Sequence, residues 1–418
     1  MNAAARAELQ RGWPILLAAV VGLGTGLGAI PIYTLGAFTK PLADAFGWSR
    51  ADVQGIFTWM TVGNLLAAPL VGTAIDRFGV RRVTLVSTLG QVAGYVAFAA
   101  LAHSAAPLWY FQLVAFVTAV IGVGTVPVTW TRAVVQWFDA ARGLALGLAL
   151  SGTGLAATFL PSLTTWLVAT VGVSGAYLGM AALPALLAFP LAWLLLREPE
   201  ATVLTTGGHT RPAERAGDPL RHVLTNYRFW VINASFVLVG GSLAGLNGHL
   251  IPLLTDHGMS AATAAGVAGV TGMAVLVGRL SSGYLVDRLW APLVAAAILL
   301  LPSMTSLMLA SDAAASMAVP AAVLMGVGVG AEFDLMAFLV SRYFGRRHYG
   351  TIYGIVYALF RAATGVGPLW FGYAFDTTGT YAGVLRISAL LIVAGAMALL
   401  TLGSYPAHRT TATAPTRT

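Results

Sequence analysis

The sequence predicts an all-α membrane protein with twelve transmembrane helices arranged in two pseudo-symmetric six-helix halves. Of its 418 residues, 58% are hydrophobic and only 9% are charged, whereas a soluble domain carries about 25% charged residues. Apolar runs of about 20 residues, the length that crosses a bilayer core, recur from one end of the chain to the other. A G-x-x-x-D-R sequence also occurs once in each half, at 72–77 and at 283–288.

The apolar runs are expected to be helices, because lipid offers no water to satisfy exposed backbone groups. Short polar connections separate the runs. The twelve expected spans lie at approximately 14–38, 52–74, 83–101, 107–136, 143–168, 174–196, 229–254, 261–283, 291–310, 316–341, 351–373 and 383–404.

The distribution of charge predicts the orientation. Most of the 23 lysine and arginine residues lie in the termini and the even-numbered connections. This predicts that the protein spans the cell (inner) membrane with both termini on the cytoplasmic side. The net charge of +8 therefore reports topology and not a nucleic-acid partner. The chain has no cysteine, which excludes disulfides and thiolate metal sites; no metal or cofactor is expected.

The domain organisation follows from the one long polar connection. Residues 1–196 are expected to form the N-terminal half and residues 229–404 the C-terminal half. Residues 197–228 form a flexible cytoplasmic linker with a surface helix over Leu220–Tyr227, and residues 405–418 a disordered cytoplasmic tail.

A second repeat supports parallel halves. Trp137-Phe138-Asp139-Ala140-Ala141-Arg142-Gly143 precedes the fifth span, and Tyr343-Phe344-Gly345-Arg346-Arg347-His348-Tyr349-Gly350 precedes the eleventh. Two such correspondences at nearly one offset predict a binding site between the halves, near the bilayer midplane.

With these motifs the chain resembles the major facilitator superfamily over essentially its full length. The G-x-x-x-D-R-x-G-x-R-R loop typical of that family is complete at 72–82 and shortened at 283–288. The resemblance implies that this loop locks helix ends together in one conformation and releases them in another; the alternative is that its basic residues signal topology alone. The gating candidates are Gly72, Asp76, Arg77, Gly79, Arg81, Gly283, Asp287 and Arg288.

Within that superfamily the chain is most similar to the monocarboxylate transporter and oxalate–formate antiporter group. The similarity rests on 46–50, 137–147, 249–258 and Gly278-Arg279. It implies a substrate-binding role for Arg279. Several animal members carry an aspartate one turn before this arginine for proton coupling, but this chain has Val275 there. Their complete mechanism of proton coupling therefore cannot apply to this chain.

Charged residues inside a span are costly and so mark functional candidates. Arg361 lies about 16 Å into its span, and Arg279 about two turns before Asp287. Each guanidinium offers a planar fork that matches a carboxylate, which favours an anionic substrate; the alternative is that each arginine pairs with an internal acid. Arg132 lies nearer the interface, where its side chain can snorkel.

Three residues are candidates for proton coupling. Glu332 and Asp334 are deep in a span, and burial favours their protonation. They are about 200° apart around a helix, so we do not expect both to face one cavity. We expect one to pair with an arginine and the other to stay near its protonation threshold. His249 is the third candidate, although a lone histidine in an apolar span is more often simply hydrogen-bonded.

Aromatic residues add candidate substrate contacts. The resemblance places Tyr33, Trp59, Tyr353, Tyr357 and Phe360 on spans that line the cavity. Tyr353 and Tyr357 are four positions apart and Arg361 continues their helix face, a stripe suited to an organic anion with an apolar body, or else to helix packing. Asn247 is a further hydrogen-bonding candidate.

The sequence therefore predicts a monomeric secondary transporter that moves a small organic carboxylate, with protons as the coupling ion. Anion exchange, or uptake of a larger neutral or aromatic compound such as a vitamin, are the alternatives. No nucleophile motif, metal cluster or added signalling domain is evident, which argues against an enzyme and against a sensor.

Overall fold

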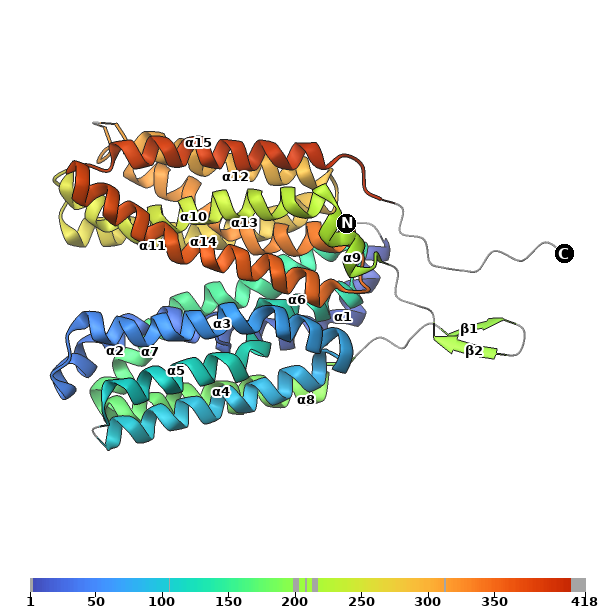
Figure 1. Cartoon of the computed structure of the whole chain (residues 1–418), viewed down its shortest axis with the longest axis horizontal. Coiled ribbons are helices and arrows are strands. Elements are labelled where there is room, and N and C mark those ends of the chain that lie inside the picture. The colour runs from blue at the N-terminus through green and yellow to red at the C-terminus, as the bar shows by residue number, and fades with distance from the viewer. Residues whose placement is uncertain are drawn as a thin grey trace.

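The computed structural model describes residues 3–104, 106–197, 203–206, 209–212, 217–311 and 313–406. Long helices lie side by side in two bundles, α1 to α8 and α10 to α15, which we call the N half and the C half (Figure 1). The elements are α1 Ala3–Thr25, α2 Ile30–Phe46, α3 Arg50–Phe78, α4 Val80–His103, α5 Leu108–Gly122, η1 Val123–Thr125, α6 Pro127–Trp137, α7 Arg142–Leu183, η2 Pro184–Ala188, α8 Phe189–Leu195, β1 Val203–Thr206, β2 His209–Pro212, α9 Leu220–Thr225, α10 Tyr227–Asp256, α11 Ala261–Val286, α12 Ala291–Leu309, α13 Ala318–Phe344, α14 Tyr349–Thr378, α15 Ala382–Leu399 and η3 Leu400–Leu402.

The predicted fold class is confirmed. Within the described residues, eleven continuous helical stretches are long and apolar enough to cross a membrane. One of them, Arg142–Leu195, has 54 residues, which is more than twice the roughly 20 residues that a bilayer requires. Its chain reverses at Gly172, whose φ of +73° lies in the left-handed region, so this stretch supplies the fifth and sixth of the twelve spans.

The first span differs from the single helix expected over 14–38. Helix runs from Ala3 to Phe46, but it breaks between Thr25 and Ile30. Side chains from neighbouring helices satisfy the backbone at this break: Gln91 donates to the Thr25 carbonyl at 2.8 Å, and the Leu27 N–H donates to the Thr125 hydroxyl at 3.1 Å. A break at membrane depth is tolerated only when its polar groups find such partners.

The short motif at 46–50 forms the turn from α2 to α3. Gly47 ends α2 in the left-handed conformation, with φ of +70°. Ser49 then caps α3 by accepting from the Asp52 N–H, while the Asp52 carboxylate accepts from the Ser49 N–H. Phe46 and Trp48 stack on each other, so the motif encodes a rigid connection.

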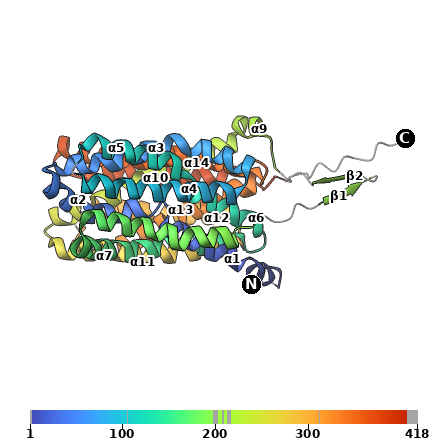
Figure 2. The same cartoon turned by 90° about the horizontal axis from the view of Figure 1, so that it is seen from below.

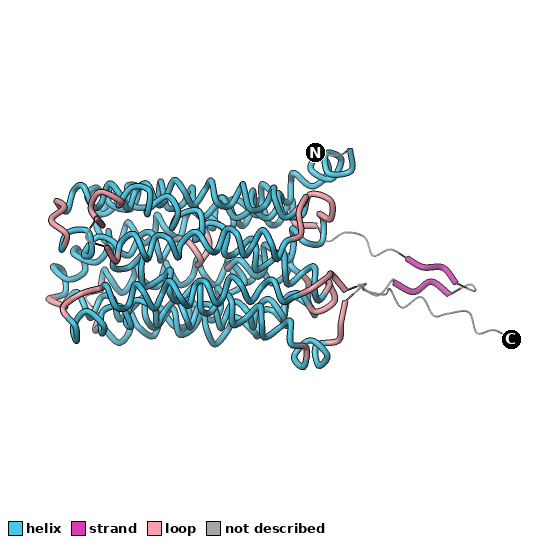
Figure 3. The backbone as a smooth tube through the Cα atoms, turned by 90° about the horizontal axis from the view of Figure 1, so that it is seen from above, coloured by secondary structure: helices cyan, strands magenta, loops and turns pink. Residues whose placement is uncertain are grey.

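The linker is described in part. β1 and β2 pair as an antiparallel hairpin, and α9 occupies most of the stretch expected to be a surface helix. Residues 198–202, 207–208 and 213–216, and 407–418 of the expected tail, lie outside the described residues. The start of the described chain, the hairpin and the last described residues after α15 lie at one end of the bundle, which we call the linker end (Figures 2 and 3).

Close backbone crossings hold the helices together. A Cβ added to Gly152 of α7 would lie 1.9 Å from the Val20 carbonyl oxygen of α1, so only glycine fits where these helices cross.

We therefore expect Gly152→Ala to destabilise the protein by about 1–3 kcal/mol, seen as a lower unfolding temperature in detergent. Gly36→Ala is the matched control, because its Cβ would meet no atom within 4 Å; an equal loss in both variants would contradict the crossing argument.

Candidate functional site

Two aspartates join the halves at the linker end, and they do so in the same way. Asp76, at the end of α3, accepts from the backbone N–H groups of Gly350 at 3.2 Å and Thr351 at 2.9 Å, in the first turn of α14. Asp287, which follows α11, accepts from the N–H groups of Gly143 at 2.6 Å and Leu144 at 2.9 Å, in the first turn of α7. Each carboxylate thus caps the positive N-terminus of a helix in the other half.

Paired glycines make these contacts sterically possible. A Cβ on Gly72 would lie 2.2 Å from the Gly350 carbonyl oxygen, and one on Gly283 would lie 2.4 Å from that of Gly143. Side chains at these positions would push the helix backbones apart and move each aspartate away from the N–H groups that it binds. The motif glycines and aspartates therefore act together.

The environment of the two aspartates differs. Arg132, fully buried, lies 3.2 Å from Asp76 and also donates to the Arg346 carbonyl, so it is part of this junction. Burial raises the pKa of Asp287 above its ordinary value, and the N–H groups of Leu144 and Gly143 oppose that shift. The loss of water on burial is thus the largest influence on the pKa of Asp287.

The other four gating candidates contact their own half. Gly79 has a φ of +85° and forms the turn between α3 and α4. Arg81 donates to the Trp193 carbonyl at 2.6 Å, Arg77 lies over the Phe78 ring, and Arg288 lies over the ring of Tyr284. Their gating role stays a prediction.

Sequence reasoning missed Glu8 and the loop that it binds. The Glu8 carboxylate accepts from three consecutive N–H groups, those of residues 139–141, at 3.0–3.1 Å. Asp139 of this loop binds Arg142 and, across the halves, Arg346. No local pattern in the first twelve residues signals this contact, because its partners are more than 130 positions away.

All hydrogen bonds and ion pairs between the halves, within the described residues, lie at the linker end. Besides the aspartates, Arg346 donates to the Phe138 carbonyl at 3.2 Å, and Arg142 donates to the Ser341 hydroxyl at 3.2 Å. The conformation described here is therefore closed at the linker end.

A buried charge cluster lies farther into the bundle, where α11 crosses α7 and α13. The Arg279 Nη1 atom lies 3.7 Å from the Asp334 Oδ1 atom, and all three of Arg279, Asp334 and Glu332 are at most 5% exposed. A Cβ on Gly147 of α7 would lie 2.6 Å from the Arg279 carbonyl oxygen and 3.6 Å from Asp334. The cluster therefore lies against the other half.

Both acids lie in the field of the same arginine. Arg279 interacts electrostatically with Asp334 and with Glu332, although the helical angle between the acids favoured only one facing a shared site. Of the two acids, only Asp334 forms an ion pair with Arg279 among the described residues, and which acid faces a shared cavity stays a prediction. Within the described residues, Arg279 Nε and Nη1, both Asp334 oxygens and Glu332 Oε1 have no hydrogen-bond partner; the nearby Ser282 hydroxyl donates instead to the Arg279 carbonyl.

The tyrosine stripe is present as a ladder of rings. Tyr349 stacks on Tyr353 with ring centres 5.5 Å apart, and Tyr353 contacts Tyr357 at 6.5 Å. Tyr353 and Tyr357 are buried and Arg361, one turn on, is half-buried. Tyr33 is half-buried and lies within electrostatic range of Arg279. The residues predicted to contact substrate therefore divide into a buried set and a partly exposed set.

Three further candidates lie apart from the cluster. Asn247 and Trp59 are exposed. Both ring nitrogens of His249 are engaged, Nδ1 with the Tyr381 hydroxyl and Nε2 with the Pro368 carbonyl, each at 3.0 Å. Because a carbonyl only accepts, Nε2 carries a proton. This geometry supports the structural interpretation of His249 over a proton-carrying role.

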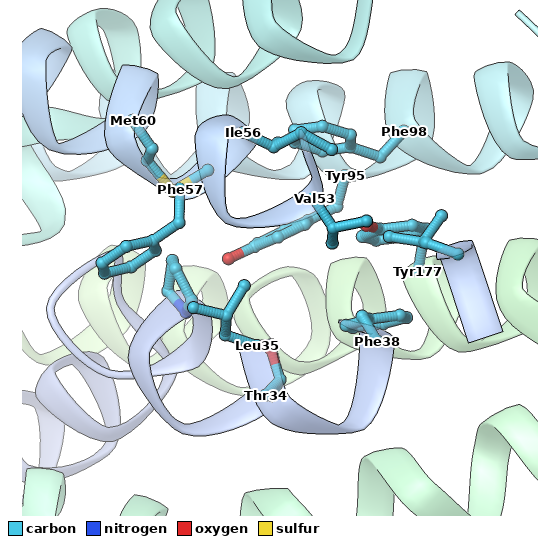
Figure 4. Close-up of a pocket in the computed structure, with 12 residues that line it drawn as sticks. Thr34, Leu35, Phe38, Val53, Ile56, Phe57, Met60, Tyr95, Phe98 and Tyr177 are labelled. Atoms are coloured by element: carbon cyan, nitrogen blue, oxygen red, sulfur yellow. The ribbon is translucent and has the colours of Figure 1, made fainter. Parts of the chain in front are cut away.

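An apolar pocket of about 50 Å³ lies inside the N half (Figure 4). The Tyr95 hydroxyl points into the space between Phe57 and Val53, and Thr34 donates to its own helix. The pocket is lined by no cationic side chain. It therefore does not suit an organic anion, and the charge cluster remains the candidate site.

The linker-end contacts generate a prediction about conformation. Asp76→Asn and Asp287→Asn each remove the charge that caps a helix in the other half, so we expect each to favour opening by about 1 kcal/mol. The chain has no native cysteine, so spin labels at Leu194→Cys and Leu289→Cys, both exposed, report the distance between the halves at this end.

Longer distances should become more populated in either variant. Asp52→Asn, which weakens a helix cap at the opposite end, is the control and should leave the distribution unchanged. Unchanged distances in both aspartate variants would show that these contacts do not hold the end closed.

Comparison with proteins of known sequence agrees with this architecture. Human monocarboxylate transporter 11 is 26% identical over 394 residues, which cover 92% of this chain and 82% of that protein. The Mus musculus protein of the same name is 28% identical over 293 residues, covering 68% of this chain and 61% of the relative. The uncharacterized MFS-type transporter YhjX of Escherichia coli is 25% identical, covering 81% of this chain and 82% of that protein.

Solved structures show the same fold. FucP, an E. coli fucose:proton symporter, in its outward conformation matches with a TM-score of 0.73 at 15% identity, covering 93% of this chain and 98% of that one. The human organic anion transporter MFSD10 matches with a TM-score of 0.66 at 16% identity, covering 95% and 100%.

A family model settles the membership. The model described as Major Facilitator Superfamily matches residues 15–368, most of the chain. Its members are transporters and not enzymes, as the sequence predicted for this chain, and the protein is an integral multi-pass membrane protein. The chain belongs to the Major Facilitator Superfamily.

Proposed function

We propose that this transporter carries a small organic carboxylate and that Arg279 binds the carboxylate group. The observation that carries the proposal is the buried Arg279 guanidinium, which has Asp334 at 3.7 Å but whose Nε and Nη1 atoms have no hydrogen-bond partner among the described residues. Donors without a hydrogen bond are costly to bury, and a substrate carboxylate can accept a charge-assisted hydrogen bond from such a donor. The names of the monocarboxylate and organic anion transporters among the similar proteins support this substrate class.

Asp334 provides the means of coupling to protons. Its carboxylate lies 3.7 Å from Arg279, where it competes with an anionic substrate for the same charge. A proton taken up by Asp334 neutralises that competitor, and the substrate carboxylate then balances Arg279. Release of substrate and proton on the other side restores the Arg279–Asp334 pair, so one proton accompanies one carboxylate.

This arrangement replaces the aspartate that is missing at Val275. The acid comes from α13 and not from the turn of α11 that precedes Arg279. Glu332 lies in the same field and is the second candidate carrier, whereas the hydrogen bonds of His249 make it the weakest of the three.

Alternating access follows from the two halves. We propose that residues 1–196 rock against residues 229–404 and that Asp76 and Asp287 make the closed linker end. The basic connections favour a position of that end on the cytoplasmic side of the cell inner membrane. We propose that the protein acts as a monomer. The described conformation then faces outward, and Arg361, Tyr33 and Asn247 offer the first contacts to an arriving anion.

The substrate proposal predicts the effect of changing Arg279. Proteoliposomes are tested for uptake of labelled lactate, pyruvate, oxalate and benzoate, with an inward proton gradient. Arg279→Lys keeps the charge but loses the fork, so transport of the accepted acid should fall by about tenfold to a hundredfold, the value of a charge-assisted hydrogen bond. Arg11→Lys, on the exposed start of α1, is the control.

Retained uptake in Arg279→Lys with wild-type protein levels would contradict carboxylate binding by Arg279. If the wild type transports none of the acids, the alternative of a neutral or aromatic substrate replaces the proposal. Uptake that requires an anion inside the vesicles and ignores the proton gradient would instead indicate exchange.

The coupling proposal predicts a separable defect in Asp334→Asn. The amide is permanently neutral, so Arg279 stays available and substrate exchange between the two sides should continue. Accumulation driven by a proton gradient should be lost, because no proton is carried. Glu332→Gln is the matched variant; loss of accumulation there, with Asp334→Asn unaffected, would assign the proton to Glu332 and overturn the role of Asp334.

A further inference from the structure

Two cavities adjoin on the N half at the linker end, outside the site described above. The first, of about 850 Å³, lies between the turn from α3 to α4 and the end of α8. Four exposed arginines line it: Arg77, Arg81, Arg82 and Arg197. A polar cavity with this charge selects an anion.

Among the described residues, the arginines of this cavity have no carboxylate as an ion-pair partner. Asp76 also lines the cavity, but its carboxylate is engaged with Arg132 and with the first turn of α14. Arg81 instead donates to the Trp193 carbonyl and lies over its ring.

The second cavity is apolar and continues from the first. It has about 440 Å³, lies between α3, α4 and α5, and is lined by exposed side chains such as Leu70, Val86 and Ile121. Phe78 and Arg82 line both cavities. One ligand with an anionic head and an apolar chain would therefore contact both.

We propose that the two cavities form a binding site for an anionic phospholipid. Its phosphate occupies the basic cavity and one acyl chain lies along the apolar cavity between α3, α4 and α5. Trp193, 55% exposed beside the arginines, is the aromatic residue expected at the level of the headgroups. A free phosphate would use only the basic cavity, so the apolar continuation favours the lipid as the source of the anion.

The site adjoins the junction between the halves. Asp76 lines the basic cavity with one side and caps α14 with the other. The basic residues of the first motif thus have a partner outside the protein, while its aspartate has a partner in the other half. This assignment is independent of the substrate that the transporter carries.

Titration calorimetry on the full-length protein in non-ionic detergent tests the site. The probes are dioctanoyl-phosphatidylglycerol, dioctanoyl-phosphatidylcholine and inorganic phosphate. We expect phosphatidylglycerol to bind more tightly than the other two. Arg82→Gln/Arg197→Gln should weaken its binding by about tenfold to thirtyfold, from about 1 kcal/mol for each basic residue.

Two further variants separate the sources of the anion. Val86→Trp fills the apolar cavity from an exposed position, so it should weaken phosphatidylglycerol binding and leave phosphate binding unchanged. Arg11→Gln/Arg221→Gln removes the same charge from exposed positions outside the cavity and should leave lipid binding intact.

Three results would overturn the proposal. Equal binding of the two lipids would remove the role of the headgroup charge. An equal loss in both double variants would indicate a non-specific charge effect. Phosphate that binds as tightly as phosphatidylglycerol, with no effect of Val86→Trp, would identify a free-phosphate site. Matching elution profiles in size-exclusion chromatography confirm that each variant is folded.

Discussion

The arrangement of the two halves depends on one interaction made twice, a carboxylate that caps the N-terminus of a helix across the interface. Asp76 binds the first turn of α14 and Asp287 binds the first turn of α7. The first N–H groups of a helix have no partner in their own helix, so each aspartate satisfies groups that would be costly to leave unpaired. The paired glycines at these crossings let the backbones approach closely enough.

These contacts also position the chemistry deeper in the bundle. Both Gly283 and Arg279 of α11 lie against the backbone of α7, at Gly143 and at Gly147. At the second of these crossings Arg279 lies beside Asp334. A buried ion pair at 3.7 Å is poorly compensated for the loss of water. In the mechanism that we propose, this poor compensation lets a proton and a substrate carboxylate replace the pair without a large penalty.

The loop at 72–82 faces two different regions. Its aspartate contacts the C half, while Arg77, Arg81 and Arg82 line a basic cavity at the linker end. The arginines that predict the orientation of the chain are thus the residues to which we assign the lipid phosphate. The lipid that we propose would lie next to the contact between the halves at Asp76.

The sequence by itself determined the spans, the repeat of the two halves and the identity of Arg279, Asp76 and Asp287 as candidates, because hydropathy and motif spacing are local properties read against a bilayer of known thickness. Only the tertiary structure decided which groups meet. It placed Asp334, and not Glu332, within ion-pair distance of Arg279, engaged both nitrogens of His249, and placed Glu8 on the loop at 139–141. Such contacts depend on how helices cross and rotate, and they join residues far apart in the chain, so no local pattern records them.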